Sequence, residues 1–248
     1  MQNKDKGCLK VLICASTANE LSGIKGLDTK SLIVGKIFTY NDLIYIALIG
    51  VGYFSSVYYF TKIALLHEYC LVFAVGISGD YRLTQPIPQL YVVESACFAD
   101  SGFEDKQGNF KPLVGSNFIG NNSFPFDNGV INNGLAKVFA QEYGLETCRA
   151  NTVNRTRTEK KLTEELLRQF PAEIETMESA AIQYVAKLER VPVIEIRATS
   201  NHVTPKYIES WHIGEAIALL CDFLNINICS AGIENFKKLF TEIEQNYY

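Results

Sequence analysis

The sequence has few of the features that mark the commonest classes of enzyme. Its 248 residues include only three histidines, His67, His202 and His212, and their positions match none of the spacings of a metal site. Neither the phosphate loop that ends in Gly-Lys-Ser/Thr nor the Gly-x-Ser-x-Gly turn of a nucleophilic serine occurs. We therefore expect neither a catalytic metal nor a bound cofactor.

Cysteine patterning of the kind found in disulfide frameworks and zinc sites is also missing. The seven cysteines show no Cys-x-x-Cys spacing, and most fall inside apolar stretches, at positions 8, 14, 70, 97, 148, 221 and 229. Cys97 lies within an apolar run that has no histidine near it, which favours a core thiol over a nucleophile. The pattern predicts reduced cysteines in a cytoplasmic protein.

The chain also lacks an excess of positive charge and a long apolar run. Its formal net charge is -4, and the 23 lysines and arginines are scattered, the densest group being Arg155, Arg157, Lys160 and Lys161. Such a charge distribution argues against nucleic acid as a partner. The apolar stretches are too short to cross a bilayer, and the first residues do not form a secretory signal, so no membrane association is expected.

What the sequence does contain is a pattern of short apolar runs and amphipathic segments. The runs predict strands that are covered on both faces: Lys10–Ala15, Leu43–Ile49, Leu71–Val75, Leu90–Phe98 and Val193–Thr199. Helical periodicity covers Ser55–Glu68, Glu178–Glu189 and a region from Ile213 onward that Gly232 interrupts. Together these segments predict an α/β protein, a single domain over residues 1–248, with a sheet between helix layers.

The region Ser101–Val130 is the least regular part of the sequence. It is rich in Gly, Asn, Pro and Phe and predicts a long loop excursion. Such excursions are often binding loops, and a simple surface insertion is an equally good interpretation.

Candidate functional residues are the polar groups that directly follow apolar runs, because ligands gather at the carboxyl ends of strands in α/β sheets. Glu20 follows the first run, and Gly76–Asp80 follow the third. Glu178 opens the helix before the last run, which ends in Ser200-Asn201. Each of these features taken alone also has an ordinary explanation as a helix start or a turn.

Taken together, the four places resemble the superfamily of nucleoside phosphorylases and nucleosidases. Thr176–Ala181, Val191–Val193 and Ile196–Asn201 are similar in order and spacing to the family's E-M-E-x-A-A, V-P and R-A-x-S-D segments. The resemblance implies a single-domain nucleoside phosphorylase-like fold, with a twisted mixed sheet, partly barrel-like, flanked by helices.

Within the superfamily the chain is most similar to the futalosine hydrolases. Ala15–Thr17 with Glu20 is like the A-A-T-x-x-E start of that branch, and Phe98–Phe110 resembles its F-x-D-x-G-x-E-D-x-x-G-F segment. Asn201 with Val203, Pro205 and Trp211 also looks like that branch.

The resemblance implies a role for each candidate residue. Glu20 matches the position that activates a water molecule, Glu178 the carboxylate that accepts hydrogen bonds from the ribose 2'- and 3'-hydroxyls, and Met177 a residue that packs against the sugar. Asn201 would contact the base as the second catalytic residue. The remaining predicted substrate-binding residues are Gly76, Ile77, Gly79 and Ser200.

Three departures from the family pattern refine this assignment. Where adenine-cleaving nucleosidases have an aspartate, Asn201 carries an amide that cannot release a proton but can donate a hydrogen bond to N7 or O6 of a 6-oxopurine. Thr176 stands where the nucleosidases have another glutamate. The loop Ser16–Gly26 contains no arginine to hold phosphate, which favours water as the nucleophile.

The sequence therefore predicts an N-glycosyl hydrolase for a 6-oxopurine nucleoside, with futalosine as the expected substrate and menaquinone biosynthesis as the pathway. A methylthioadenosine/S-adenosylhomocysteine nucleosidase, a purine nucleoside phosphorylase and a non-catalytic nucleoside-binding relative remain alternatives. An NAD-type dehydrogenase is a more distant one, because Gly50-Val51-Gly52 is an incomplete dinucleotide motif. The expected partners are a small-molecule purine nucleoside and, by resemblance, further copies of the chain in a homodimer or larger homo-oligomer.

Overall fold

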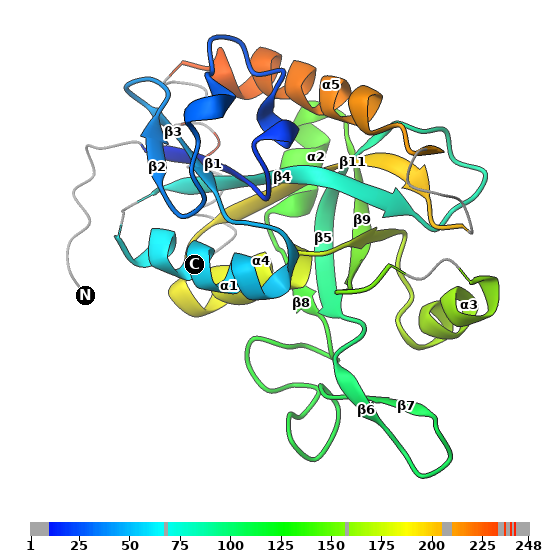
Figure 1. Ribbon diagram of the computed structural model, residues 1–248. Helices are drawn as coiled ribbons and strands as arrows, with labels where there is room; N and C mark the ends of the chain where they lie inside the picture. The colour runs from blue at the N-terminus through cyan, green and yellow to red at the C-terminus, as the bar shows by residue number, and fades with distance from the viewer. Residues whose placement is uncertain are drawn as a thin grey trace.

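The computed structural model describes residues 10–66, 69–156, 159–204 and 210–232, together with 236, 239 and 241. Within this part of the chain, a mixed sheet lies among helices (Figure 1). The strands are β1 (Val11–Ala15), β2 (Ile37–Thr39), β3 (Ile44–Leu48), β4 (Leu71–Asp80), β5 (Leu90–Phe98), β6 (Gly102–Glu104), β7 (Phe110–Pro112), β8 (Ile131–Asn132), β9 (Glu146–Thr152), β10 (Ile174–Thr176) and β11 (Val193–His202). The α-helices are α1 (Gly52–Leu66), α2 (Ala136–Tyr143), α3 (Lys160–Gln169), α4 (Ser179–Glu189) and α5 (Ile213–Leu224). The short 3-10 helices are η1 (Asn19–Leu21) and η2 (Thr29–Ser31), and η4 (Asn225–Cys229) is a π-helix.

The sheet runs in the order β10-β9-β5-β11-β4-β1-β3-β2. Strand β4 lies at its centre and pairs in parallel with β1 on one side and β11 on the other. Beyond Val75, β4 continues to Asp80, and Gly79 and Asp80 pair antiparallel with Glu175 and Ile174 of β10. This last pairing closes a ring through β4, β11, β5, β9 and β10, and it confirms the partly barrel-like sheet.

The two faces of the sheet are covered by different helices. Val11, Ile13 and Ala15 of β1 belong to the core formed with α2 and α5, and Leu12 and Cys14 to the core formed with α1 and α4. Since alternate strand residues point to opposite faces, β1 needs apolar side chains at every position, and all five are fully buried. The predicted sheet between helix layers is therefore confirmed.

One predicted strand end is wrong. The sequence predicts that strand β4 ends at Val75, but the strand continues through Gly76 and Gly79 to Asp80. Ladder pairing to β11 and β10 on either side supplies the backbone partners that a turn would have lacked. The glycines therefore keep the strand free of side chains where other groups approach it.

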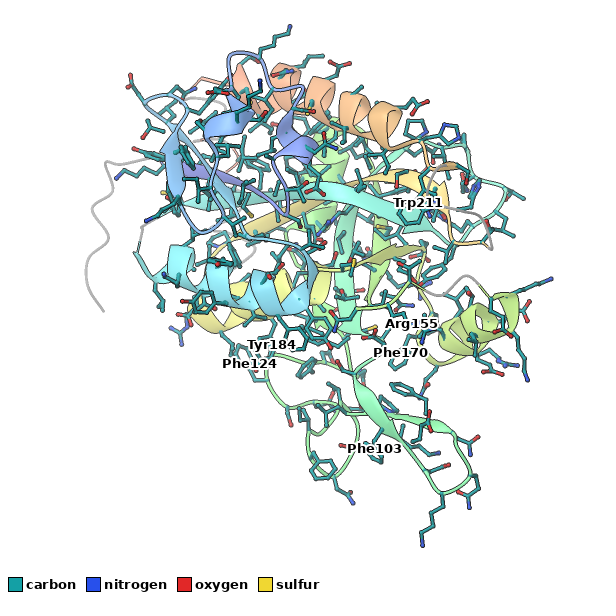
Figure 2. The ribbon with its side chains drawn as sticks, in the orientation of Figure 1. Phe103, Phe124, Arg155, Phe170, Tyr184 and Trp211 are labelled. Carbon is teal, nitrogen blue, oxygen red and sulfur yellow. The ribbon has the colours of Figure 1, made fainter. Side chains whose placement is uncertain are left out.

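The irregular region after β5 contains a small hairpin, β6 with β7, that lies outside the main sheet. It extends away from the body of the molecule, and Phe103 on it is partly exposed (Figure 2).

Five residues of the sequence predictions, Cys8, His67, Glu68, Arg157 and Pro205, lie outside the described residues. No helix in the described part of the chain is long and apolar enough to cross a membrane.

Candidate active site

A cavity of about 270 Å³ opens where β1, β4 and β11 end. It is lined by Ser16, Thr17, Asn19, Glu20, Val51, Ile77, Ser78, Gly79, Thr156, Glu175, Thr176, Met177, Glu178, Ser200, Asn201, Trp211, Ile213 and Ile217. The carboxyl ends of neighbouring parallel strands meet at one edge of a sheet, which explains why residues so far apart in sequence converge here. Seven of the eight predicted site residues line this cavity.

Gly76, the eighth, lies just behind the lining. A Cβ atom added there would be 2.6 Å from Glu20 Oε1 and 2.6 Å from Arg197 Nη1. Contacts of that length are not tolerated without movement, so the glycine leaves room for a carboxylate and a guanidinium to approach the same stretch of backbone. Its role is to create space between them.

Glu20 is held by neutral donors. Its Oε2 accepts hydrogen bonds from the Thr17 backbone N–H (2.8 Å) and hydroxyl (3.0 Å), and its Oε1 accepts one from the Ile77 N–H (3.2 Å). Only 6% of the residue is exposed. Burial raises the pKa of this carboxyl, the positive charge of Arg197 opposes that rise, and the negative charge of Glu178 adds to it.

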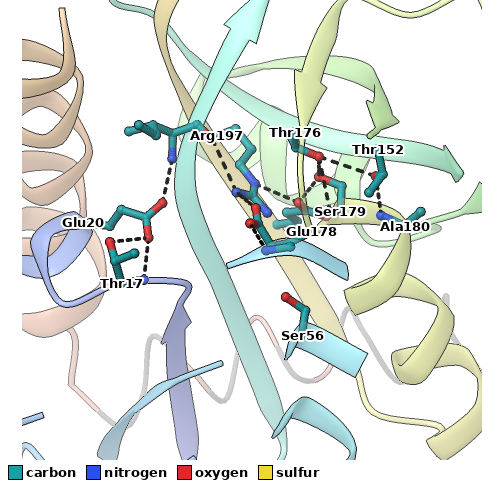
Figure 3. Close-up of polar contacts among 12 residues, drawn as sticks. Thr17, Glu20, Ser56, Thr152, Thr176, Glu178, Ser179, Ala180 and Arg197 are labelled. Carbon is teal, nitrogen blue, oxygen red and sulfur yellow. Dashed lines mark hydrogen bonds and ion pairs between the residues drawn. The ribbon is translucent and has the colours of Figure 1, made fainter. Parts of the chain in front are cut away.

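Glu178 has a charged partner instead. It is the N-terminal capping residue of α4; its Oε1 accepts the Gly52 N–H at 3.0 Å, and its Oε2 lies 3.3 Å from Arg197 Nη1. Gly52 begins α1 with a φ of 81°, a left-handed conformation in which glycine carries no steric penalty. Figure 3 shows Glu20 and Glu178 on either side of β4 in this view.

The guanidinium of Arg197 is fixed from behind by a buried polar network. Its Nε donates to Glu195 Oε1 at 2.8 Å, and both side chains are almost completely buried. Glu195 also accepts hydrogen bonds from the Ser179 hydroxyl and, at 3.1 Å, from Gln183 Nε2. Nearby negative charge, chiefly that of Glu195 and Glu178, raises the pKa of Arg197 against the effect of burial.

Thr176 lines the cavity and also takes part in this network. Its hydroxyl donates to Ser179 Oγ at 2.7 Å and accepts the Ser179 backbone N–H at 3.2 Å. Thr176 therefore helps to fix the first turn of α4, directly after Glu178. Where related nucleosidases have a glutamate, this chain therefore has a threonine whose hydroxyl is hydrogen-bonded to Ser179.

A bulge in β11 positions Ser200 and Asn201. Thr199 pairs with Ser78 and Asn201 with the next residue, Gly79, so Ser200 is an extra residue in the ladder. Bulges of this kind change the direction in which a side chain points, and they are common next to active sites. The Ser200 hydroxyl lies 2.9 Å from Asn201 Oδ1 and 3.2 Å from the Ser78 carbonyl, either of which it can donate to.

The rest of the lining is largely apolar. Val51, Met177, Ile213 and Ile217 supply aliphatic surface, and Trp211 lies at the end of the segment between β11 and α5 (Figure 2). The His212 backbone N–H donates to the Ser200 carbonyl at 2.7 Å, which holds the residue after Trp211 against β11. Flat apolar surfaces beside a few polar groups are typical of pockets for aromatic ligands.

The sequence prediction missed several lining residues. Val51 and Thr156 come from connections whose course depends on long-range packing, and neither is among the predicted site residues. Glu175 is the most notable omission, because it is a third buried carboxylate in the lining and directly precedes the Thr176-Met177-Glu178 motif. Among the described lining residues there is no lysine or arginine.

Comparisons with known proteins identify the family of this chain. A family model described as the phosphorylase superfamily matches residues 12–225. Futalosine hydrolase from Streptomyces coelicolor is 32% identical over 157 residues, an alignment that spans 62% of this chain and 63% of that protein, which is less than two thirds of its length.

Two solved structures share the fold. A futalosine hydrolase mutant of Helicobacter pylori superposes with a TM-score of 0.69 and 21% identity, covering 94% of this chain and 99% of that one. A mutant of the Helicobacter pylori 5'-methylthioadenosine/S-adenosyl homocysteine nucleosidase, with 5'-methylthioadenosine in its active site, has a TM-score of 0.64 and 19% identity over 94% of this chain and 99% of that one.

Proposed function

Since the chain belongs to the phosphorylase superfamily, we propose that it hydrolyses the N-glycosidic bond of a 6-oxopurine nucleoside. We further propose that the nucleoside is futalosine, split into hypoxanthine and dehypoxanthine futalosine in menaquinone biosynthesis. The observation that carries the proposal is a pair of buried carboxylates, Glu20 and Glu178, in one cavity with the amide of Asn201. The identity of 32% to a futalosine hydrolase supports the choice of substrate.

The reaction sets clear chemical requirements. As the bond from C1' to the base breaks, positive charge develops on the ribose and negative charge on the departing base. Water then adds to C1' and loses a proton, and the base takes up a proton. The site must therefore accept a proton from water, hold the ribose, and donate hydrogen bonds to the base.

Glu20 is the proposed base for the water molecule. Its burial raises its pKa, which makes the carboxylate a better proton acceptor than a solvated glutamate. The donors on Thr17 and Ile77 fix its two oxygens, and no residue in the described part of the chain forms an ion pair with it. Proton transfer from water would therefore not have to disrupt a salt bridge.

Glu178 is the proposed ribose clamp. An ionised carboxylate is an acceptor-only group with about four lone-pair positions, so one side chain can accept from two neighbouring hydroxyls. The Gly52 N–H and the Arg197 guanidinium occupy part of that capacity and fix the carboxylate in place. The predicted contact with the 2'- and 3'-hydroxyls uses the remainder.

Asn201 is the proposed reader of the leaving base. Its amide N–H₂ can donate to N7 or O6 of hypoxanthine, whereas the 6-amino group of adenine would need an acceptor there. A mispaired buried hydrogen bond costs about 1–3 kcal/mol, which corresponds to roughly tenfold or more in selectivity. The Ser200 hydroxyl beside Asn201 Oδ1 supports this orientation of the amide.

Water is favoured over phosphate as the nucleophile by the charge of the lining. The described lining includes the carboxylates Glu20, Glu175 and Glu178 but no lysine or arginine to hold a phosphate anion. Arg197, the guanidinium just behind the cavity, is already paired with Glu195 and Glu178. A phosphate ion would meet net negative charge here.

The direct test is to incubate the purified protein with futalosine, inosine and methylthioadenosine, each with and without phosphate, and to quantify the released base by chromatography. We expect hypoxanthine from futalosine at a rate that phosphate does not change. A strict requirement for phosphate would replace hydrolysis by phosphorolysis. Adenine release from methylthioadenosine at a comparable rate would overturn the 6-oxopurine assignment.

The base assignment has its own test in Asn201→Asp. An aspartate offers an acceptor for a 6-amino group and a proton for N7, so the ratio of kcat/KM for futalosine to that for its adenine analogue should fall about tenfold or more. Asn19→Asp, which adds the same charge at another lining position, is the matched control. An equal change in both variants would mean that charge alone, and not base recognition, is responsible.

We also propose a cytoplasmic homodimer. The six described cysteines are all free thiols, as expected in a reducing compartment. Phe54, Tyr58 and Leu65 on α1 are 75%, 58% and 66% exposed, and Val51, which precedes that helix in the cavity lining, is 53% exposed. This apolar surface suits a self-complementary contact between two copies. Size-exclusion chromatography with light scattering should give a dimer, and Phe54→Glu should give a monomer.

A further inference from the structure

The loop that carries Glu20, residues 16–26, has little regular structure of its own. Its backbone N–H groups at Leu21, Ser22 and Ile24 donate to carbonyls three residues earlier, at 3.2, 3.1 and 3.1 Å. Hydrogen bonds of this 3-10 type have poorer geometry than those of an α-helix, so they hold the loop weakly. The position of Glu20 therefore depends on what the loop packs against.

Helix α5 is the element beside this loop (Figure 1). Leu21 and Ile24 of the loop share one apolar core with Leu220 and Cys221 of the helix, and all four are buried. Gly23 lets the two segments approach closely, because a Cβ added there would lie 2.7 Å from Cys221 Cβ. Carbon atoms attract one another at about 3.5–4.0 Å, so any larger residue would push the loop away from the helix.

Two side chains of the helix also bond to the loop backbone. Cys221 Sγ donates to the carbonyl of Glu20 itself, 3.4 Å away. Asn225, at the end of α5, uses both atoms of its amide: Nδ2 donates to the Gly23 carbonyl at 2.9 Å, and Oδ1 accepts the Lys25 N–H at 3.0 Å. Since a thiol is a weak donor, the two bonds of Asn225 are the stronger polar link between helix and loop.

The same side of α5 also reaches the cavity. Ile213 and Ile217 line it, and Cys221 and Asn225 follow at intervals of four residues. Residues with this spacing lie above one another on successive helical turns. One helix therefore contacts both the cavity and the loop that carries Glu20.

We propose that Asn225 is a positioning residue for the reaction: its two bonds hold the loop of residues 16–26 against α5, where the Glu20 carboxylate can reach the attacking water. This inference rests on the proposed function, in which Glu20 is the base. Asn225 is not among the described residues that line the cavity, so its effect on the reaction must pass through the loop.

Asn225→Ala removes both bonds. Because a displacement of about 1 Å at a reacting group can lower a rate about hundredfold, we expect kcat for futalosine to fall about ten- to hundredfold. KM should stay within a few-fold of the natural value, since Glu178 and Asn201 are held by α4 and β11. A rise in KM with kcat unchanged would overturn the proposal.

Asn227→Ala is the matched control. Asn227 Nδ2 donates to the Phe223 carbonyl at 3.0 Å, a bond within the helical region and not to the loop. This variant should keep the natural kcat. Asn225→Asp retains an acceptor for the Lys25 N–H but loses the donor to Gly23, so its kcat should lie between those of the natural protein and Asn225→Ala. Equal losses in Asn225→Ala and Asn227→Ala would mean a general effect on stability and would refute positioning.

A double-mutant cycle with Glu20→Gln tests whether Asn225 acts through the carboxylate. In the Glu20→Gln background there is no base left to position, so Asn225→Ala should lower the residual rate by less than about twofold. A further loss of about tenfold or more in that background would show that Asn225 acts on the reaction by another route.

Gly23→Ala displaces the loop by a different means, through the contact of its new Cβ with Cys221. It should reproduce the loss in kcat with little change in KM, and it keeps the test available if Asn225→Ala does not fold. Thermal unfolding of each variant confirms that the folded protein is assayed. Natural kinetics in a folded Gly23→Ala would contradict the dependence of Glu20 on the contact with α5.

Hydrogen–deuterium exchange separates this proposal from the proposed function, because it needs no turnover. Amides of residues 16–26 should exchange faster in Asn225→Ala than in the natural protein and at the natural rate in Asn227→Ala. Unchanged exchange in Asn225→Ala, or faster exchange with unchanged kcat, would overturn the proposal and leave the hydrolase intact. Faster exchange in Asn225→Ala, combined with no nucleoside turnover by the natural protein, would refute the hydrolase and support the placement of the loop by Asn225.

Discussion

The surroundings of Glu20 and of Glu178 differ in the charge of their partners rather than in burial. Both carboxylates line the same cavity, at 6% and 5% exposure. Glu20, on η1 after β1, accepts from two backbone N–H groups and a hydroxyl, all of them neutral. Glu178, at the start of α4, contacts one backbone N–H and the guanidinium of Arg197.

This difference supports the different roles proposed for the two carboxylates. A buried carboxylate with neutral donors gains from taking up a proton, because protonation removes the desolvated charge. A carboxylate bound to a guanidinium would lose an ion pair in the same step. Glu20 is therefore suited to proton transfer, and Glu178 to accepting hydrogen bonds from hydroxyl groups.

The largest effect is expected from Glu20→Gln. An amide cannot take the proton of the attacking water, and loss of a general base lowers rates by about 10²–10⁴-fold. The variant should therefore lose kcat by that factor while the dissociation constant for futalosine stays within a few-fold of the natural value. Single-turnover assays would measure the rate of the chemical step, and calorimetry would measure the dissociation constant.

Glu189→Gln is the matched control for this change, since Glu189 is an exposed glutamate at the end of α4. It should retain full activity. If Glu20→Gln were as active as Glu189→Gln, another group would have to activate the water, and the proposed difference in role between Glu20 and Glu178 would be wrong.

Glu178→Gln should act on the ribose instead. The amide keeps one acceptor oxygen but loses charge, so kcat/KM for futalosine should fall about ten- to hundredfold. The sharper readout is a comparison with 2'-deoxyfutalosine: the natural protein should prefer the ribonucleoside, and the variant should have lost most of that preference. An unchanged preference would mean that Glu178 does not contact the 2'-hydroxyl.

Much of this site could be read from the sequence because its strands are apolar. The runs that became β1, β3, β4, β5 and β11 are covered on both faces, so their composition predicts them well. Glu20 and Asn201 then follow from the position of polar residues near strand ends. The resemblance to a known family added Met177 and the role of Glu178.

The missed parts depend on contacts between distant segments. Strand β9, with the sequence Glu-Thr-Cys-Arg-Ala-Asn-Thr, has no apolar run, and its polar side chains are satisfied by tertiary partners. Thr152 accepts the Ala180 N–H at 2.8 Å, and Asn151 donates to the Phe170 carbonyl at 2.9 Å. No local pattern reports such bonds, and the same holds for Glu175 on the short strand β10.

Gly76→Ala tests the space between the two carboxylates. The added methyl group would lie 2.6 Å from both Glu20 Oε1 and Arg197 Nη1, and both are ends of side chains that can shift. We expect the fold to persist and kcat to fall about tenfold, as Glu20 moves from the position in which it can reach water. Gly134→Ala, where no atom lies within 4 Å of the new Cβ, should leave kcat unchanged.

The smallest expected effect is a shift in the pH profile, and it links the two carboxylates directly. Glu20 must be ionised to accept a proton, so kcat/KM should fall as the pH drops through its pKa, which burial holds above the ordinary value of 4.5. The negative charge of Glu178 contributes to that rise, and the positive charge of Arg197 opposes it. Glu178→Gln removes the negative charge of Glu178, and it also leaves the positive charge of Arg197 less neutralised. Both changes lower the pKa of Glu20. The acid limb of the kcat/KM profile should therefore move to lower pH in this variant. A limb that moved to higher pH would require a different group to be the base.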